Sequence, residues 1–133
     1  MIETFEEMPK VKANGLNVLV LASVGDAAYT LAVREKLSFF DLKAGELSKR
    51  AAEKVCARAQ AEKADRLSEV FSEEEEEIFR RGRNAKKGAR AKHASVEDYN
   101  AATGLEAVFG YLALTGQRER FYYLFGYGEE DAK

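Results

Sequence analysis

Three residue types that commonly organise small proteins are almost absent from this sequence. The 133 residues include one proline, one cysteine and one histidine, which are Pro9, Cys56 and His93. A single cysteine excludes an internal disulfide, and one cysteine with one histidine cannot build a structural zinc site. Because proline is so rare while Ala, Leu, Glu, Lys and Arg dominate, the composition favours helix over strand. A chain of this length makes one domain, and we expect it in the reducing cytoplasm.

The sequence also lacks a signal-like start and an uninterrupted apolar run. Its first ten residues, MIETFEEMPK, are acidic and unlike a secretory signal. The longest apolar stretch, residues 16–33, is broken by Gly25 and Asp26, so we expect a buried helix and no membrane partner. The net charge of −2, from 21 basic and 23 acidic residues, does not by itself indicate nucleic acid. Any RNA-binding prediction therefore depends on where the basic residues cluster.

What the sequence does contain is a succession of helical patterns. Predicted helices cover about 17–39, 46–71, 72–83, 95–114 and 118–125. Ser72 begins a capping-box pattern with Glu75, and Ser95 begins a second capping pattern. No strand alternation, repeat or linker interrupts this series. The sequence therefore predicts a single all-α domain.

Two isolated acids are the most informative feature. Asp26 is the only charged residue in the range 13–33, and Glu106 is the only one in the range 99–117. Both segments are otherwise typical of buried helices, where an ionised carboxylate needs a partner. Small neighbours one turn away, such as Ala22, leave room for a cation that keeps several waters. We predict a Mg²⁺ site with Asp26 and Glu106 as catalytic metal ligands; the alternative is that each is a hydrogen-bonded structural acid.

A strip of basic residues without any acid occupies residues 80–92, and its second half falls in a predicted exposed loop. Arginine and lysine side chains in such a strip can contact phosphate groups. The alternative is a solvated helix end and loop with no ligand. The candidate RNA-binding residues are Arg81, Arg83, Asn84, Lys86, Lys87, Arg90 and Lys92.

Three segments resemble the ribonuclease III family. LASVGDAAYTLAVRE resembles the signature helix, with the Gly-Asp-Ala core at residues 25–27. ATGLEAVFGYLALTG resembles the second acidic helix, with Glu106 at the metal-ligand position. RRGRNAK, from Arg80 to Lys86, resembles a loop motif of the Mini-ribonuclease III subfamily. The resemblance implies a ribonuclease III-like catalytic domain over residues 1–133 with its core at about 16–125.

The resemblance also implies an activity and its partners. It implies a homodimer that binds double-stranded RNA between its subunits and hydrolyses phosphodiesters with Mg²⁺, leaving 5′-phosphate and 3′-hydroxyl ends. The implied substrate is the stem of precursor 23S ribosomal RNA, and assistance by a ribosomal protein stays open. Standard ribonuclease III has further acids at the positions of Leu19, Ala22 and Thr103, so the number of metal ions also stays open. We expect no separate double-stranded-RNA-binding domain.

Two other function classes compete with this enzyme. The first is a non-catalytic ribonuclease III-like RNA-binding scaffold associated with ribosome assembly. Such a scaffold is expected to lose the signature acids, whereas Asp26 and Glu106 are both present. The second is a helical interaction protein without any RNA role, which would not need isolated acids flanked by small residues. The retained acids therefore favour the endoribonuclease.

Overall fold

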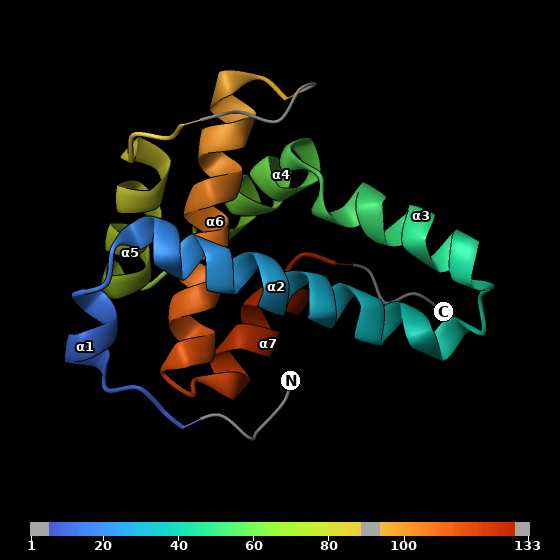
Figure 1. Cartoon of the computed structure of the whole chain (residues 1–133), viewed down its shortest axis with the longest axis horizontal. Helices are drawn as coiled ribbons and strands as arrows, with labels where there is room; N and C mark the ends of the chain where they lie inside the picture. Colours follow the sequence, from blue (N-terminus) through green and yellow to red (C-terminus); the bar gives the residue numbers. More distant parts are fainter. Residues whose placement is uncertain (1–5, 89–93, 130–133) are drawn as a thin grey trace.

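The computed structural model is an assembly of helices around one central helix, α6, and it describes residues 6–88 and 94–129 (Figure 1). The helices are α1 (Lys10–Asn14), α2 (Val18–Leu37), the short 3₁₀ helix η1 (Ser38–Phe40), α3 (Ala44–Val55), α4 (Ala57–Leu67), α5 (Glu73–Asn84), α6 (Val96–Leu114) and α7 (Arg118–Gly126). Helix α6 is flanked by α2, α5 and α4, and no strand occurs in the described ranges. The predicted all-α fold is confirmed.

Side-chain caps define where the main helices begin. The Ser72 hydroxyl accepts from the Glu75 amide at 3.1 Å, and the Glu75 carboxylate accepts from the Ser72 amide at 2.9 Å, so α5 opens with the predicted capping box. Ser95 caps α6 by accepting from the Asp98 amide at 3.0 Å. Asn17 caps α2 in the same way. These caps satisfy amide groups that have no partner within the helix.

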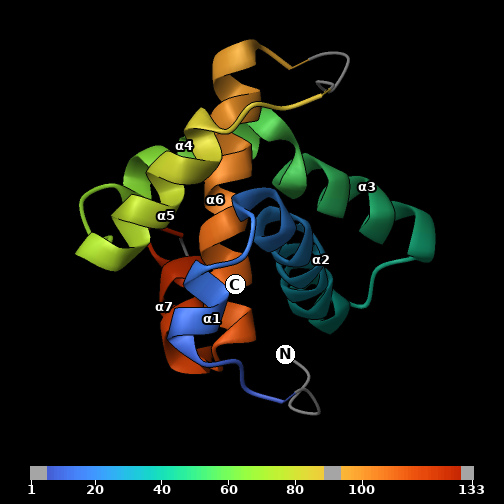
Figure 2. The same cartoon turned by 60° about the vertical axis from the view of Figure 1, so that its left-hand side comes forward.

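The predicted helix over 46–71 is instead two helices. Cys56 has an extended backbone conformation, with φ −66° and ψ 159°, and separates α3 from α4. The break lets α4 pack against the central helix while α3 projects beside α2 (Figure 2). Because the two helices need different directions, tertiary packing overrides the helical propensity of this segment.

Helices α2 and α6 cross with their backbones in direct contact. A Cβ atom added to Gly25 would collide with the Glu106 carbonyl, and one added to Gly110 would collide with the Leu21 carbonyl. Both glycines are buried, so no side chain separates the helices at this point. A similar contact joins α5 to α6, where a Cβ on Gly82 would lie 2.8 Å from the Gly104 Cα. Glycine therefore sets the spacing of the core.

Aromatic and charged contacts fasten α7 to this core. The Phe109 ring of α6 lies 4.9 Å from Tyr29 and 4.8 Å from Phe121, both edge to face. Arg120 donates to both carboxylate oxygens of Glu75 at 2.9 and 2.8 Å, which ties α7 to the first turn of α5. Within the described ranges, no helix is long and apolar enough to span a membrane.

The glycine contacts predict a large difference between two substitutions. Gly110→Ala should lower the free energy of unfolding by about 3 kcal/mol or more, because overpacking costs about 1–3 kcal/mol even where neighbours can shift and here the neighbour is backbone. Gly45→Ala, in exposed α3 with nothing near its Cβ, should raise it by up to about 1 kcal/mol. Urea unfolding measures both values. An unchanged midpoint for Gly110→Ala would contradict the close crossing.

Candidate active site

The two predicted acids lie side by side at the crossing of α2 and α6. Asp26 follows Gly25, which touches the backbone of Glu106, and the two carboxyl groups interact directly. Asp26 is exposed and Glu106 is partly buried. The expectation that both acids are buried is therefore wrong for Asp26, because α2 turns this face toward solvent. Within the described part of the chain, neither acid pairs with Lys or Arg.

The electrostatics of the pair are unfavourable without a cation. The pKa of the Glu106 carboxyl is raised from 4.5 to about 8. Burial is the larger cause, and the neighbouring charge of Asp26 is the second. Two close carboxylates disfavour double ionisation unless a positive charge lies between or beside them. The pair is therefore suited to a cation at the α2–α6 crossing.

A third polar residue, Gln60 of α4, faces Glu106 and was missed by the sequence analysis. Its side chain is only 1% exposed, and it lowers the pKa of Glu106. Neither its nitrogen nor its oxygen makes a hydrogen bond of standard length and angle. The available signal was helical spacing, since Gln60 shares the buried face of α4 with Lys63, Ala64 and Leu67.

These side chains fit a hard divalent cation that keeps much of its water. Magnesium commonly takes one or two protein carboxylates and completes its shell with water and phosphate oxygens. Asp26 and Glu106 supply the carboxylates, and the unpartnered Gln60 amide supplies a further polar group. In the described ranges, no group of three or more Asp, Glu, His or Cys side chains is arranged so that it could hold a metal ion. The chemistry of the donors thus suits Mg²⁺ better than a metal that needs a full protein cage.

The basic strip divides into residues that contact the protein and residues that extend into solvent. Arg81 donates to the Leu16 carbonyl at 3.3 Å, and Lys87 donates to the Ala85 carbonyl at 2.7 Å. Arg83, Asn84 and Lys86 are exposed around the end of α5. Among the predicted contacts that the structure describes, these three have the most accessible side chains.

Two further residues of the strip, Arg90 and Lys92, lie outside the described residues. The strip begins beside α6, because Gly82 packs on Gly104, only two residues before Glu106 in sequence. However, residues two apart on a helix point to different sides, so Gly82 packs on a different side of α6 from Glu106.

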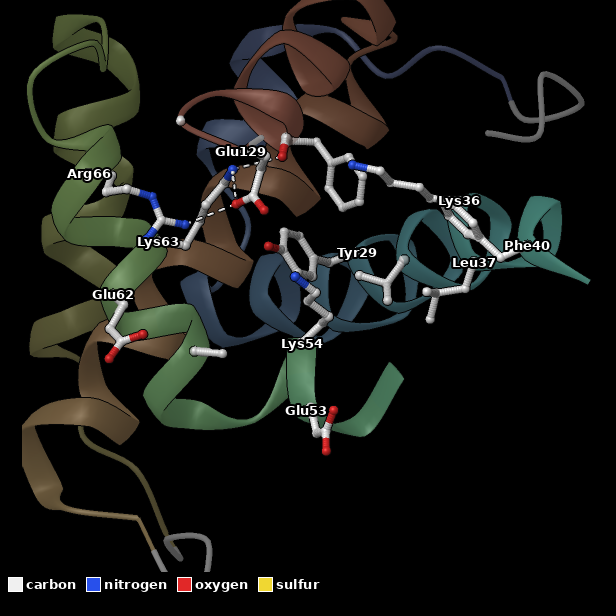
Figure 3. A pocket seen from close by; sticks show the side chains of 14 residues that line it. Tyr29, Lys36, Leu37, Phe40, Glu53, Lys54, Glu62, Lys63, Arg66 and Glu129 are labelled. Carbon is white, nitrogen blue, oxygen red and sulfur yellow. Dashed lines mark hydrogen bonds and ion pairs between the residues drawn. The ribbon is translucent and has the colours of Figure 1, made fainter. Parts of the chain in front are cut away.

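A cavity of about 600 Å³ lies apart from the acid pair, between α2, α3, α4 and α7 (Figure 3). Lys63, 1% exposed, points to this region and donates to the Phe125 and Tyr127 carbonyls at 2.7 and 2.8 Å. Lys63 and Arg66 also pair with Glu129 at 3.1 and 2.9 Å. This network fastens the segment after α7 to α4, and we assign it a structural role.

Comparison with known proteins decides the family. Residues 19–117 match the Ribonuclease III domain model. The chain belongs to the ribonuclease III family. Curated relatives named Mini-ribonuclease 3 include one from Thermoanaerobacter sp., 42% identical over 90% of this chain and 84% of the relative. Another, from Enterococcus faecalis, is 46% identical over 79% of this chain and 82% of the relative.

A solved structure shares this fold. A crystal structure of a Fusobacterium nucleatum protein superposes with a TM-score of 0.79 at 28% identity, covering 84% of this chain and 90% of that one. The resemblance to Mini-ribonuclease III is thus confirmed, and with it the assignment as an endoribonuclease. Members of the ribonuclease III family act on double-stranded RNA and generally depend on divalent metal ions.

The raised pKa of Glu106 predicts how stability depends on pH in the metal-free protein. A carboxyl group whose folded pKa lies above its unfolded pKa stabilises the fold fully below the unfolded value and loses that contribution as pH rises. Stability from this group should therefore fall between about pH 4.5 and 8. Urea midpoints measured in EDTA should decline over that range more steeply for the wild type than for Glu106→Gln. Parallel curves for the two proteins would contradict the shift.

Proposed function

We propose that this ribonuclease III family member is a Mg²⁺-dependent endoribonuclease that cleaves double-stranded RNA, with the stem of precursor 23S ribosomal RNA as its substrate in the cytoplasm. The observation that carries the proposal is the meeting of Asp26 and Glu106 at the α2–α6 crossing. The curated relatives named Mini-ribonuclease 3 support the choice of RNA as substrate. The proposed catalytic domain spans residues 1–133, with its core at about 16–125.

Asp26 and Glu106 would hold the metal ion. When bound, Mg²⁺ supplies positive charge that activates water and stabilises charge on the scissile phosphate. Asp26 would hold the ion from the solvent-exposed side, whereas Glu106 would hold it from the partly buried centre of α6. The backbone contact of Gly25 with Glu106 would keep the distance between the two acids constant. Precise positioning of this kind is what the reaction requires of its metal ligands.

The proposed reaction is a hydrolysis in one displacement. A water oxygen attacks the phosphorus, and the bond from phosphorus to the 3′ oxygen breaks. The departing 3′ oxygen takes up a proton, and the products carry 5′-phosphate and 3′-hydroxyl ends. Because the attacking water and the leaving oxygen lie roughly in line, the work of the protein is mainly positioning and charge stabilisation.

Cleavage of a long RNA duplex tests this proposal. Asp26→Asn and Glu106→Gln should each reduce the rate by about a hundredfold or more, since metal charge stabilisation is worth several kcal/mol and about 1.4 kcal/mol is tenfold. EDTA should abolish cleavage of the wild type. Asp65→Asn and Glu97→Gln are matched controls on exposed positions of α4 and α6, and they should cleave normally.

The same assay separates the competing functions. Full cleavage by Asp26→Asn would overturn the assignment of the acids. Duplex binding without cleavage, equal in wild type and Asp26→Asn, would instead identify a non-catalytic RNA-binding scaffold. No duplex binding at any salt concentration would point to a helical interaction protein.

We further propose that the basic strip binds the phosphates of the duplex. The proposed contacts are Arg81, Arg83, Asn84, Lys86 and Lys87, together with Arg90 and Lys92. Arg83, Asn84 and Lys86 are exposed at the end of α5, where their side chains can reach a ligand without any rearrangement of the core. Recognition through backbone and shape suits A-form RNA, whose deep groove hides its bases.

Salt dependence tests the strip. Arg83→Ala and Lys86→Ala should each weaken binding to an RNA duplex in EDTA, and each should reduce the slope of log affinity against log salt by about 1. Lys49→Ala, at an exposed position of α3, is the matched control and should leave the slope unchanged. Fluorescence anisotropy at several salt concentrations provides the measurement. Wild-type slopes for both strip variants would reject the assignment.

We also propose that the chain forms a homodimer through α2. This helix is apolar on both sides: one side packs on α6, while Val20 and Leu31 remain 48% and 42% exposed on the other. A helix that is hydrophobic all round is normally buried all round. Phe39, in η1 just past the end of α2, is a further large apolar side chain and is 84% exposed. A second copy of the chain would cover these side chains, and a ribosomal protein remains a further proposed partner.

Sedimentation measures this dimer. Val20→Glu combined with Leu31→Glu should shift the protein from dimer to monomer, because the introduced charges lose hydration at an apolar interface. Val96→Glu places the same charge at a 56% exposed position outside α2 and should leave the dimer intact. A wild type that sediments as a monomer up to high micromolar concentration would exclude the homodimer.

A further inference from the structure

Gln60 is a buried amide that makes no hydrogen bond of standard length and angle. Its side chain is 1% exposed, and neither its nitrogen nor its oxygen reaches that geometry with any partner. Burying an unsatisfied donor or acceptor destabilises the fold, so native proteins rarely retain such a group without a use for it. Among the described residues, no other buried side chain leaves its nitrogen or oxygen in this state.

The surroundings of Gln60 explain why an apolar residue has not replaced it. Its neighbours on the buried face of α4 include Ala64 and Leu67, which pack into the core. The amide itself lies beside the carboxyl of Glu106 on α6. An ionised carboxylate only accepts hydrogen bonds, so the donating nitrogen is the atom suited to face it.

We propose that Gln60 is a positioning residue of the metal site, whose Nε2 donates to the ionised Glu106 carboxylate and whose Oε1 accepts from a water in the site. The proposal rests on the proposed function, because it gives Glu106 the role of metal ligand. Groups behind the ligands commonly fix their orientation, and losing one typically costs about 10–100-fold in metal affinity or activity. Both orphaned atoms of Gln60 would then be satisfied in the loaded enzyme.

This role predicts opposite effects on stability and on metal binding. Gln60→Met has nearly the same shape, no hydrogen-bond donor and only a weakly accepting sulfur. In the metal-free protein, its melting temperature should equal or exceed that of the wild type, because a buried unsatisfied amide has been removed. Its affinity for Mn²⁺, used here as the probe, should nevertheless fall by about 10–100-fold. A residue that only packs the core would show no such separation.

The experiment titrates Mn²⁺ alone into wild type, Gln60→Met and Gln60→Leu by calorimetry and records the melting temperature of each. Thr115→Val is the matched control, because it removes another buried polar group at the far end of α6, where the hydroxyl donates to the Tyr111 carbonyl at 2.7 Å. This control should lose stability and keep its Mn²⁺ affinity. Excess Mn²⁺ should restore most of the duplex cleavage by Gln60→Met, but not by Glu106→Gln.

Each contrary outcome has a distinct meaning. Equal Mn²⁺ affinity in wild type and Gln60→Met would overturn the role of Gln60 and leave the metal site standing. Wild-type binding no stronger than that of the double variant Asp26→Asn, Glu106→Gln would remove the proposed metal site and the role of Gln60 with it. If the Gln60 variants lose Mn²⁺ affinity only when their melting temperature also falls, Gln60 acts through packing and the proposal is overturned. Failure of both Gln60 variants to fold would lead to the same conclusion.

Discussion

The direct contact between the backbones of α2 and α6 is the constraint on which the rest of this structure depends. With Gly25 and Gly110 buried at the crossing, no side chain sets the spacing of the two helices. The flanking residues then have fixed positions: Asp26 comes next along α2, and Glu106 lies at the point that Gly25 touches. An interface padded by large side chains would tolerate small shifts, whereas backbone in contact with backbone does not. The fold and the site thus share one contact.

That contact also determines the electrostatics. Bringing Glu106 into the partly buried centre of α6 while placing Asp26 beside it raises the pKa of Glu106 to about 8. In the metal-free protein, the carboxyl pair is unfavourable because the two groups repel one another and Glu106 is partly buried without a cation. A bound cation removes both costs, so their removal adds to the free energy of metal binding. The pair is therefore a strained group in the apo protein and a suitable ligand set in the metal-loaded one.

Much of the helical framework follows from the sequence, because it depends on local signals. The Ser72–Glu75 capping box and the Ser95 cap determine where α5 and α6 begin, and each involves only residues three apart in sequence. The break at Cys56 was missed because its cause is tertiary: α4 must turn to reach α6. The two acids were identified because they are isolated among apolar residues. The exposure of Asp26 depends on which face of α2 is turned toward solvent, and residue spacing along a single helix does not determine this face.

Gln60 shows why a site is harder to complete from sequence than to locate. A glutamine on an amphipathic helix is ordinary, and only the packing of α4 against α6 makes it a buried amide facing a carboxylate. Selection for stability alone would replace it with an apolar residue of similar volume, because both of its polar atoms are unsatisfied. Active sites commonly keep such unfavourable groups where binding a ligand satisfies them. On that reasoning, polar groups in unfavourable surroundings mark the chemistry. Two close carboxylates and one buried amide converge where α2, α4 and α6 meet, and a single hydrated cation would satisfy all three.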